Sequence, residues 1–384
     1  MESFDDIRPY CDHEVRPILD RLLQDKQLLS ALMHFSCPWL PFFLDRLLCP
    51  LVRFLLQRQL SGISDTRGLQ HIVASYIAQC VTKTTDGVVW EGLDELEDGQ
   101  PYLFLSNHRN IVMDSAFVNY GLYSRGMNTM CVAIGDNLLR RSYVSDLMRL
   151  NKSFIVQRSL NSRREKLVAY QKLSAFINHL IESGHSVWMA HREGRAKDSN
   201  DRTDSAIIKM LHMSQKKKGY SFGEVIARLR IVPVAISYEY DTCDLRKANE
   251  LKIRSQQRSY DKAVDEDMQS IGRGIKGWKG KVHVSFGKPL GSAFESATDV
   301  AKEVDRQIHS LYRLQSSNYI AYDLFCRQQG KEGISGWESG FDAVDLAEKK
   351  RVFHERMNAC QSDSREWFLK IYANPVINYL GMSV

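Results

Sequence analysis

The chain has 384 residues, of which 43% are hydrophobic, 10% aromatic and 26% charged, the composition of a folded protein with a substantial core. No segment is poor enough in apolar residues to indicate disorder. The formal net charge of +6 lacks the clustered basic footprint of a nucleic-acid-binding protein and suits an anionic membrane surface or a phosphorylated substrate.

The eight cysteines are scattered, and no two have the spacing of a CxxC zinc or redox motif. Free cysteines favour a reducing, cytosolic compartment. The N-terminus is acidic and lacks an apolar secretory core, so we expect no signal peptide.

Residues 1–75 are expected to be helical, and their most apolar stretch is 38–56. Three charged residues and three prolines make that stretch a poor membrane-spanning helix. Two interpretations have equal weight: an interfacial helix lying on a membrane, and a buried helix packed on the catalytic domain. A helix would place Asp45, Arg46, Arg53 and Gln57 on one side, and Trp39, Phe42, Phe43, Leu47, Leu51, Val52 and Leu55 over much of the remainder.

Strands and helices are expected to alternate between residues 76 and 300. The clearest helix covers 163–183, where apolar residues recur at spacings of three and four until Gly184 ends the pattern. The alternation predicts an α/β fold: a mixed, largely parallel central sheet flanked by helices, with helical additions at 1–75 and 301–384. The expected strands are 88–90, 102–106, 129–134, 154–157, 186–190, 231–240 and 281–286.

The most informative segment is LFLSNHRNIVMD at 103–114, where a strand runs into a polar turn and then into a helical pattern. Catalytic groups often lie at the carboxyl end of a strand. His108 is a natural general base near neutral pH, and the Asp114 carboxylate can fix its tautomer and stabilise the imidazolium. A histidine near an aspartate is more often structural, so this pair needs support from other segments.

Three further segments supply that support: SFIVQR at 153–158, SVWMAHREGR at 186–195 and IVPVAISY at 231–238. The first two end in arginines, and a glycine beside them lets the backbone approach a ligand. Together they indicate a phosphate clamp built from Arg158, Arg192 and Arg195. The alternative is that these arginines are surface charges around a sheet edge.

In this order the four segments resemble the glycerolipid acyltransferase family, which includes glycerol-3-phosphate and 1-acylglycerol-3-phosphate acyltransferases. The resemblance covers about residues 80–290, and FGKPL at 286–290 resembles the segment that closes these domains. It implies that His108 deprotonates an acceptor hydroxyl while Asp114 orients it. It further implies that the hydroxyl attacks the thioester of acyl-CoA or acyl-carrier protein, a co-substrate, with no metal or other cofactor. The residues implied to bind substrate are Asn107, Arg158, Glu193, Gly194 and Arg195.

Two motif spacings depart from the family pattern and indicate a divergent branch. Five residues separate His108 from Asp114, where the family usually has four. On a regular helix the extra residue turns the carboxylate by about 100°. The pair therefore meets only if His108 precedes the helix or the first turn is irregular. The third segment is one residue short, since Arg195 follows Gly194 directly, and Lys152 or Ser153 replaces a frequent glycine in the second.

The leading hypothesis is an O-acyltransferase of phospholipid synthesis that acts on a glycerol-phosphate-type acceptor, above all 1-acylglycerol-3-phosphate. We expect a peripheral or monotopic protein at the cytoplasmic face of a membrane, with a lipid acceptor, a thioester donor and no nucleic acid as partners. The non-standard spacings leave open an acyltransferase for another lipid hydroxyl, such as that of an aminolipid. They also leave open a non-catalytic membrane-associated protein. A His108–Asp114 distance of about 2.6–3.2 Å would support catalysis, and a much longer one would favour the non-catalytic protein. The polar run 197–204 is interpreted as a solvated loop in preference to an acceptor-binding element.

Overall fold

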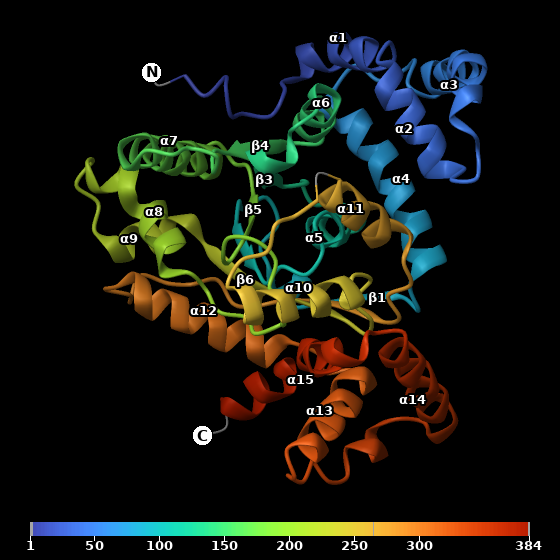
Figure 1. Ribbon diagram of the computed structural model, residues 1–384. Coiled ribbons are helices and arrows are strands. Elements are labelled where there is room, and N and C mark those ends of the chain that lie inside the picture. The colour runs from blue at the N-terminus through green and yellow to red at the C-terminus, as the bar shows by residue number, and fades with distance from the viewer. Residues whose placement is uncertain (1–2, 264, 383–384) are drawn as a thin grey trace.

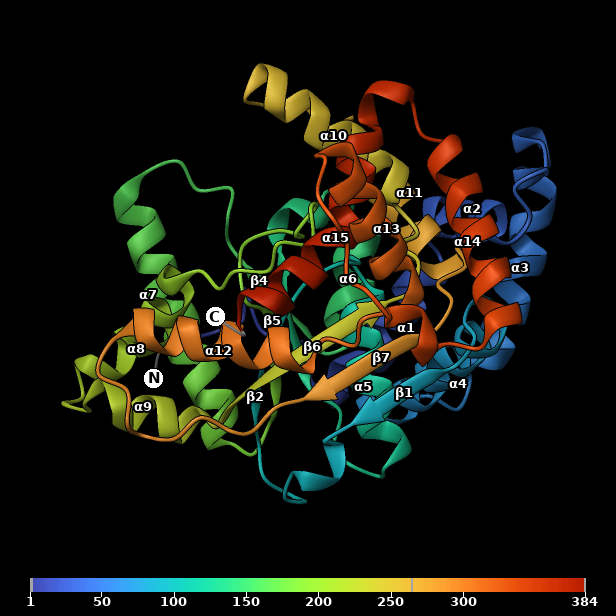
Figure 2. The same ribbon diagram turned by 90° about the horizontal axis from the view of Figure 1, so that it is seen from below.

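A seven-stranded sheet forms the centre of the computed structural model, which describes residues 3–263 and 265–382. Its strand order is β1-β7-β6-β2-β5-β3-β4 (Figures 1 and 2). The five strands from β6 to β4 are parallel, whereas β7 is antiparallel to β6 and β1 is parallel to β7. The predicted mixed, largely parallel sheet is confirmed. Each expected strand corresponds to an observed one, and their ends differ by at most two residues. The strands are β1 (Val88–Glu91), β2 (Leu103–Ser106), β3 (Cys131–Gly135), β4 (Ser153–Val156), β5 (Val187–Ala190), β6 (Ile231–Tyr238) and β7 (Val282–Phe286).

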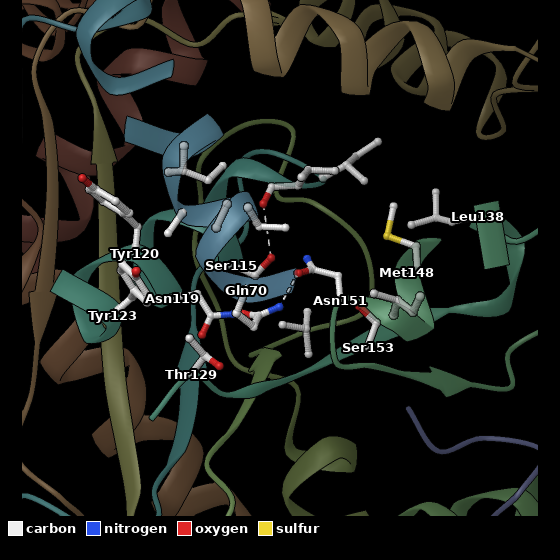
Figure 3. A pocket seen from close by; sticks show the side chains of 18 residues that line it. Gln70, Ser115, Asn119, Tyr120, Tyr123, Thr129, Leu138, Met148, Asn151 and Ser153 are labelled. Carbon is white, nitrogen blue, oxygen red and sulfur yellow. Dashed lines mark hydrogen bonds between the residues drawn. The ribbon is translucent and has the colours of Figure 1, made fainter. Parts of the chain in front are cut away.

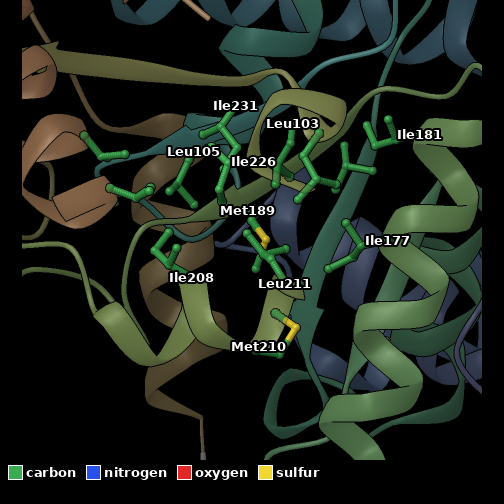
Figure 4. Packing of buried hydrophobic residues seen from close by; sticks show 14 of the residues in the cluster. Leu103, Leu105, Ile177, Ile181, Met189, Ile208, Met210, Leu211, Ile226 and Ile231 are labelled. Carbon is green, nitrogen blue, oxygen red and sulfur yellow. The ribbon is translucent and has the colours of Figure 1, made fainter. Parts of the chain in front are cut away.

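Helices cover both faces of this sheet, because successive strand residues point to opposite faces and both sets are apolar. In β2, Leu103 and Leu105 pack with one group of helices, while Phe104 packs with the other. Figure 4 shows the first of these two cores. The first group is α7 (Arg163–Glu182), α8 (Ser205–Lys216), α9 (Phe222–Leu229) and α12 (Ala297–Leu311), and the second is α4 (Thr66–Thr84), α5 (Met113–Ser124) and α11 (Glu266–Lys276).

Helical additions lie at opposite ends of the molecule in Figure 1. At one end α1 (Asp12–Leu22) and α2 (Lys26–Ser36) share a small core with α6 (Ser142–Leu150). At the other end a separate core joins α10 (Asp244–Gln257) to α13 (Ser316–Gln328), α14 (Ala343–Asn358) and α15 (Arg365–Gly381). The short 3-10 helices are η1 (Phe42–Leu44), η2 (Leu93–Glu95), η3 (Asp136–Leu138), η4 (Trp337–Gly340) and η5 (Ser362–Ser364).

Local sequence signals fix several helix ends. Ser162 and Glu165 form a capping box at the start of α7, and Gly184, with φ of 81°, follows its end in the left-handed region. The expected boundaries at residues 75 and 300 fall inside α4 and α12, and both of these helices pack on the sheet.

Helix α3 (Asp45–Gln59) contributes no buried residue; its main contacts are with neighbouring α2 and η1, and Gln59 donates to the Tyr76 hydroxyl of α4 at 3.0 Å. The interpretation of this stretch as a buried helix packed on the catalytic domain is therefore wrong. Trp39, Phe42 and Phe43, which precede the helix, are 78%, 76% and 79% exposed. Within the described residues, we find no helix with the length and apolar character needed to cross a membrane. The apolar side chains that α3 itself exposes are Leu47, Leu51, Phe54 and Leu55.

Candidate active site

His108 and Asp114 are in direct contact. The chain leaves β2 at Ser106, passes through an irregular turn, and enters α5 at Met113. His108 lies in that turn and its Nδ1 is 2.8 Å from Oδ2 of Asp114. The extra residue between them is thus accommodated because the histidine precedes the helix. This distance lies within hydrogen-bond reach and so supports the catalytic hypothesis over the non-catalytic one.

Both oxygens of Asp114 are held by several donors, and its side chain is fully buried. Besides His108, Oδ2 accepts the backbone N–H groups of Arg109 and Asn110 at 2.6 and 2.8 Å. Oδ1 accepts the hydroxyl of Tyr238 at 2.7 Å. Burial, together with the neighbouring carboxylate, raises the pKa of Tyr238 far above its ordinary value, so the phenol remains a donor. The carboxylate therefore cannot rotate away from the histidine.

The surroundings of His108 favour its neutral form. Burial lowers the pKa of His108 below its ordinary value of 6.5, although Asp114 opposes this change. Nearby positive charge on Arg195 and Lys247 lowers it further. Since Nδ1 is bound to the carboxylate, Nε2 is the ring nitrogen left to accept a proton from a substrate. The pair thus has the arrangement that a general base at neutral pH requires.

Asn107, which the resemblance implied to be a substrate ligand, has a different place in the structure. Its side chain is buried, donating to the Ile236 carbonyl at 3.1 Å and to Asp201 at 3.2 Å and accepting the Ile236 N–H at 2.8 Å. All these partners belong to the protein, and Asn107 does not line the cleft beside His108. It instead fastens the turn that carries His108 to strand β6.

The polar run 197–204 is only partly a solvated loop: Arg202 and Asp204 are exposed, but Ser199 and Asp201 are buried and the other four residues are half-buried. Asp201 forms a bidentate ion pair with Arg109 at 2.6 and 2.9 Å, and the two side chains are 3% and 4% exposed. Thr203 donates through its backbone and hydroxyl to Asp305 of α12. The run therefore ties the catalytic turn to the helical layer.

Residues remote in sequence also hold the catalytic turn. Lys247 of α10, 2% exposed, donates to the Arg109 carbonyl at 2.9 Å and pairs with Asp241. The backbone N–H of Ala196 donates to the His108 carbonyl at 3.0 Å. No motif contains Lys247, and Tyr238 ends the fourth motif without being singled out there, because each acts through a contact with a segment more than 120 residues away.

A cleft of about 310 Å³ opens at the carboxyl ends of the parallel strands and contains His108. Arg158, Glu193, Gly194 and Arg195, which the motifs singled out, all line it, as does Arg192. Gly194 has φ of 72°, in the left-handed region that favours glycine. The predicted site residues therefore line one cleft, except for Asn107 and for Asp114, which is buried behind His108. The further cationic residues that line the cleft are Lys197, Arg254 and Lys262.

A smaller apolar pocket of about 70 Å³ adjoins this cleft and shares Ile111, Val132, Ile134 and Leu138 with it. It lies between α4, α5 and β3 (Figure 3). Gln70 donates to Asn151 at 2.6 Å at its wall. In the described part of the chain, no group of three or more His, Cys, Asp or Glu side chains has an arrangement that could hold a metal ion.

A histidine–aspartate pair at the end of a strand, facing a cationic cleft, has the arrangement that general-base catalysis of group transfer requires. Residues 87–237 match the family model described as Acyltransferase. The part of the chain that carries the motifs is therefore an acyltransferase domain, and the protein is an acyltransferase.

Among solved structures, the chain is similar to the 1-acyl-sn-glycerophosphate (LPA) acyltransferase PlsC from Thermotoga maritima. The two share 14% identity over 74% of this chain and 94% of that chain, with a TM-score of 0.41. A comparison with curated proteins finds no match.

Proposed function

We propose that this acyltransferase moves a fatty acyl group from acyl-CoA or acyl-carrier protein to the hydroxyl of 1-acylglycerol-3-phosphate. The observation that carries the proposal is the 2.8 Å contact between His108 and the buried Asp114, beside a cleft rich in arginine. His108 can deprotonate the acceptor hydroxyl, and the arginines can bind a phosphate on the same acceptor.

The proposed reaction is a direct transfer. The acceptor hydroxyl gives its proton to Nε2 of His108 while its oxygen attacks the thioester carbonyl carbon. A C–O bond forms, the C–S bond breaks, and the proton passes from His108 to the thiolate leaving group. Asp114 stabilises the imidazolium that exists between these events. The products are an ester and a free thiol, and no other cofactor is involved.

Arg158 and Arg192 are the proposed ligands of the acceptor phosphate, together with Arg195. Among the described residues, neither Arg158 nor Arg192 has a carboxylate within ion-pair distance, so both charges are available to a ligand. Gly135 helps to place Arg158, since a Cβ there would lie 3.1 Å from its Nε and 2.4 Å from Oδ1 of Asn137. Guanidinium groups suit this task because they bind phosphate oxygens in pairs.

The apolar pocket of Figure 3 is the proposed site for part of an acyl chain. It shares Ile111 and Ile134 with the cleft, so an acyl chain attached near His108 would meet apolar side chains where the two spaces adjoin. Burying methylene groups there contributes about 0.8 kcal/mol each.

The exposed aromatic residues Trp39, Phe42 and Phe43, with the apolar side of α3, form the proposed membrane-docking surface. Such side chains insert into the headgroup region of a bilayer, and Arg46, Arg53 and Arg58 of the same helix suit anionic lipid. The proposed location is the cytoplasmic face of a membrane, in peripheral contact.

Thiol release from palmitoyl-CoA tests the proposal, with 1-acylglycerol-3-phosphate as acceptor. His108→Ala should abolish acceptor-dependent release, whereas His179→Ala, an exposed histidine of α7, should not. Full activity of the His108→Ala protein would sink the mechanism. Transfer to monoacylglycerol or an aminolipid but not to phosphate-bearing acceptors would replace the proposed acceptor with another lipid hydroxyl.

A further inference from the structure

One wall of the catalytic cleft comes from the segment between β6 and β7, which holds helices α10 and α11. It follows the last residue of the matched family region, 237. Three of its residues line the cleft: Arg254 in α10, Lys262 in the connection, and Asp267 in α11. This wall therefore adds charge to the cleft from outside the region that carries the motifs.

Two carboxylates of this segment each hold two cations. Glu250 pairs with Lys197 and also, at 2.7 Å, with Arg254. Asp267 lies 2.9 Å from Lys262 and 3.8 Å from Arg195. In both cases one cation belongs to the turn after β5 and the other to the α10–α11 segment. The four cations therefore outnumber the two carboxylates that bridge them.

Of the two cations that each carboxylate holds, one is much less exposed than the other. Arg195 and Lys197 are 6% and 12% exposed, whereas Arg254 and Lys262 are 51% and 37% exposed. The outer pair lies where the cleft meets solvent. When an outer cation turns from its carboxylate to a ligand, Glu250 keeps Lys197 and Asp267 keeps Arg195, so neither carboxylate is left without a cation.

The excess charge is more than one acceptor phosphate needs. Six cationic side chains and three carboxylates line the cleft. In a glycerol-phosphate acceptor, few bonds separate the phosphate from the reacting hydroxyl, so that phosphate must lie close to His108. In a thioester donor built on phosphopantetheine, a long arm separates the phosphates from the thioester. Donor phosphates therefore fall at the mouth of the cleft, where Arg254 and Lys262 are.

We propose that Arg254 and Lys262 form an anion-binding subsite at the cleft mouth that takes the phosphate groups of the thioester donor. This inference rests on the proposed function and adds to it the residues that recognise the donor. The two cationic groups of the subsite differ: Arg254 has a planar guanidinium and Lys262 a mobile ammonium. Together they suit several phosphates whose positions are not fixed by the reacting centre.

Two donors that share the thioester and the arm test the subsite, palmitoyl-CoA and palmitoyl-pantetheine, the second without phosphate. For Arg254→Ala combined with Lys262→Ala, we expect KM for palmitoyl-CoA to rise about tenfold, the loss of two partly exposed charge-assisted contacts. KM for palmitoyl-pantetheine and kcat should not change. The conservative pair Arg254→Lys and Lys262→Arg should retain most of the affinity. Lys252→Ala is the matched control, since Lys252 is on α10 but pairs with Asp363 away from the cleft.

An equal change for both donors, or no change for either, would overturn the subsite. Direct titration with CoA separates this result from a failure of the proposed function. If the unmodified protein binds CoA about tenfold more tightly than the double variant but transfers no acyl group, the subsite stands and the proposed reaction fails. If both proteins bind CoA equally, or neither binds it, the subsite fails whatever the turnover. Palmitoyl-phosphopantetheine then tells whether the phosphate nearest the arm or the nucleotide phosphates make the contact.

Discussion

At the scale of single residues, burial and the Asp114 carboxylate shift the pKa of His108 in opposite directions. Burial disfavours the imidazolium, and Asp114 at 2.8 Å favours it. Burial has the larger effect, so the pKa of His108 lies below 6.5 and the neutral base predominates at pH 7. Asp114 remains available to stabilise the cation once a proton arrives.

The first prediction concerns the pH dependence of acyl transfer. The competent histidine is neutral, a form present above its pKa, so activity should persist as the pH falls through 6.5 and decline only below it. The pH dependence of kcat/KM, measured by thiol release, shows this decline as the acidic limb of the profile. Asp114→Asn removes the influence that raises the pKa, so it should move the limb to still lower pH and reduce kcat about 10²-fold or more. An acidic limb centred above 6.5 in the unmodified protein would contradict this account.

The second prediction concerns Tyr238, whose hydroxyl is the donor to Oδ1 of Asp114. Tyr238→Phe leaves that buried oxygen without a partner, at a cost of about 1–3 kcal/mol. We expect kcat to fall about tenfold while KM for both substrates stays the same, because Asp114 loses one of the contacts that fix it. Tyr240→Phe is the matched control: this neighbouring buried tyrosine faces Arg356 instead. Equal effects of the two substitutions would show that Tyr238 has no special role.

At the scale of elements, strands and turns were far easier to predict than the environment of each loop. The strand positions are confirmed because buried parallel strands are short apolar runs that end in polar turns. The loop at 197–204 was misjudged because its composition is that of a surface loop. Asp201 is buried because Arg109 and Asn107 satisfy its carboxylate, and Thr203 is held by Asp305; those partners come from other elements.

The third prediction concerns the docking surface at residue 39 and along α3. Replacing Trp39, Phe42 and Phe43 by serine should reduce binding to anionic phospholipid vesicles at least tenfold, since each loses roughly 1 kcal/mol or more of apolar insertion. Thermal stability should hardly change, because these side chains are more than 75% exposed in the folded chain. Vesicle cosedimentation measures the first effect and calorimetry the second. Val344→Ser, at an isolated exposed site on α14, is the control. Undiminished vesicle binding by the triple variant would exclude this surface.

At the scale of the whole molecule, the C-terminal helices support the active site through α10. Helices α13 to α15 share an apolar core with α10, and α10 carries Lys247, which binds the catalytic turn. Arg356 of α14 pairs with the buried Asp244 at the start of α10 at 2.7 Å. Tyr372 of α15 donates to the same carboxylate at 2.7 Å. The C-terminal region is thus joined to the catalytic domain by charge as well as by apolar contact.

The fourth prediction concerns Arg356. Arg356→Met should destabilise the protein by roughly 3 kcal/mol, because it leaves the carboxylate of Asp244, 4% exposed, without its cation. Arg351→Met on the same helix breaks only exposed pairs with Glu348 and Glu355, so its effect should stay within about 1 kcal/mol. Urea unfolding of the two variants measures the difference. A similar stability for both would mean that the Arg356–Asp244 pair does not hold α10 in place.

The sequence by itself determined the fold class, the strand positions and most of the cleft residues. These depend on local patterns: apolar runs, turn residues, and arginines or a histidine placed where a strand ends. Parallel strands bring their carboxyl ends to one edge, so His108, Arg158 and Glu193 converge once the sheet forms.

Only the tertiary structure decided whether the histidine and aspartate could meet, that Asn107 has a positioning role, and that α3 is exposed. It also brought Tyr238, Lys247 and Arg254 to the site. The physical reason is that each of these depends on contacts between segments distant in the chain. A buried polar group is hydrogen-bonded wherever the fold supplies a partner, and no local pattern in the sequence names that partner.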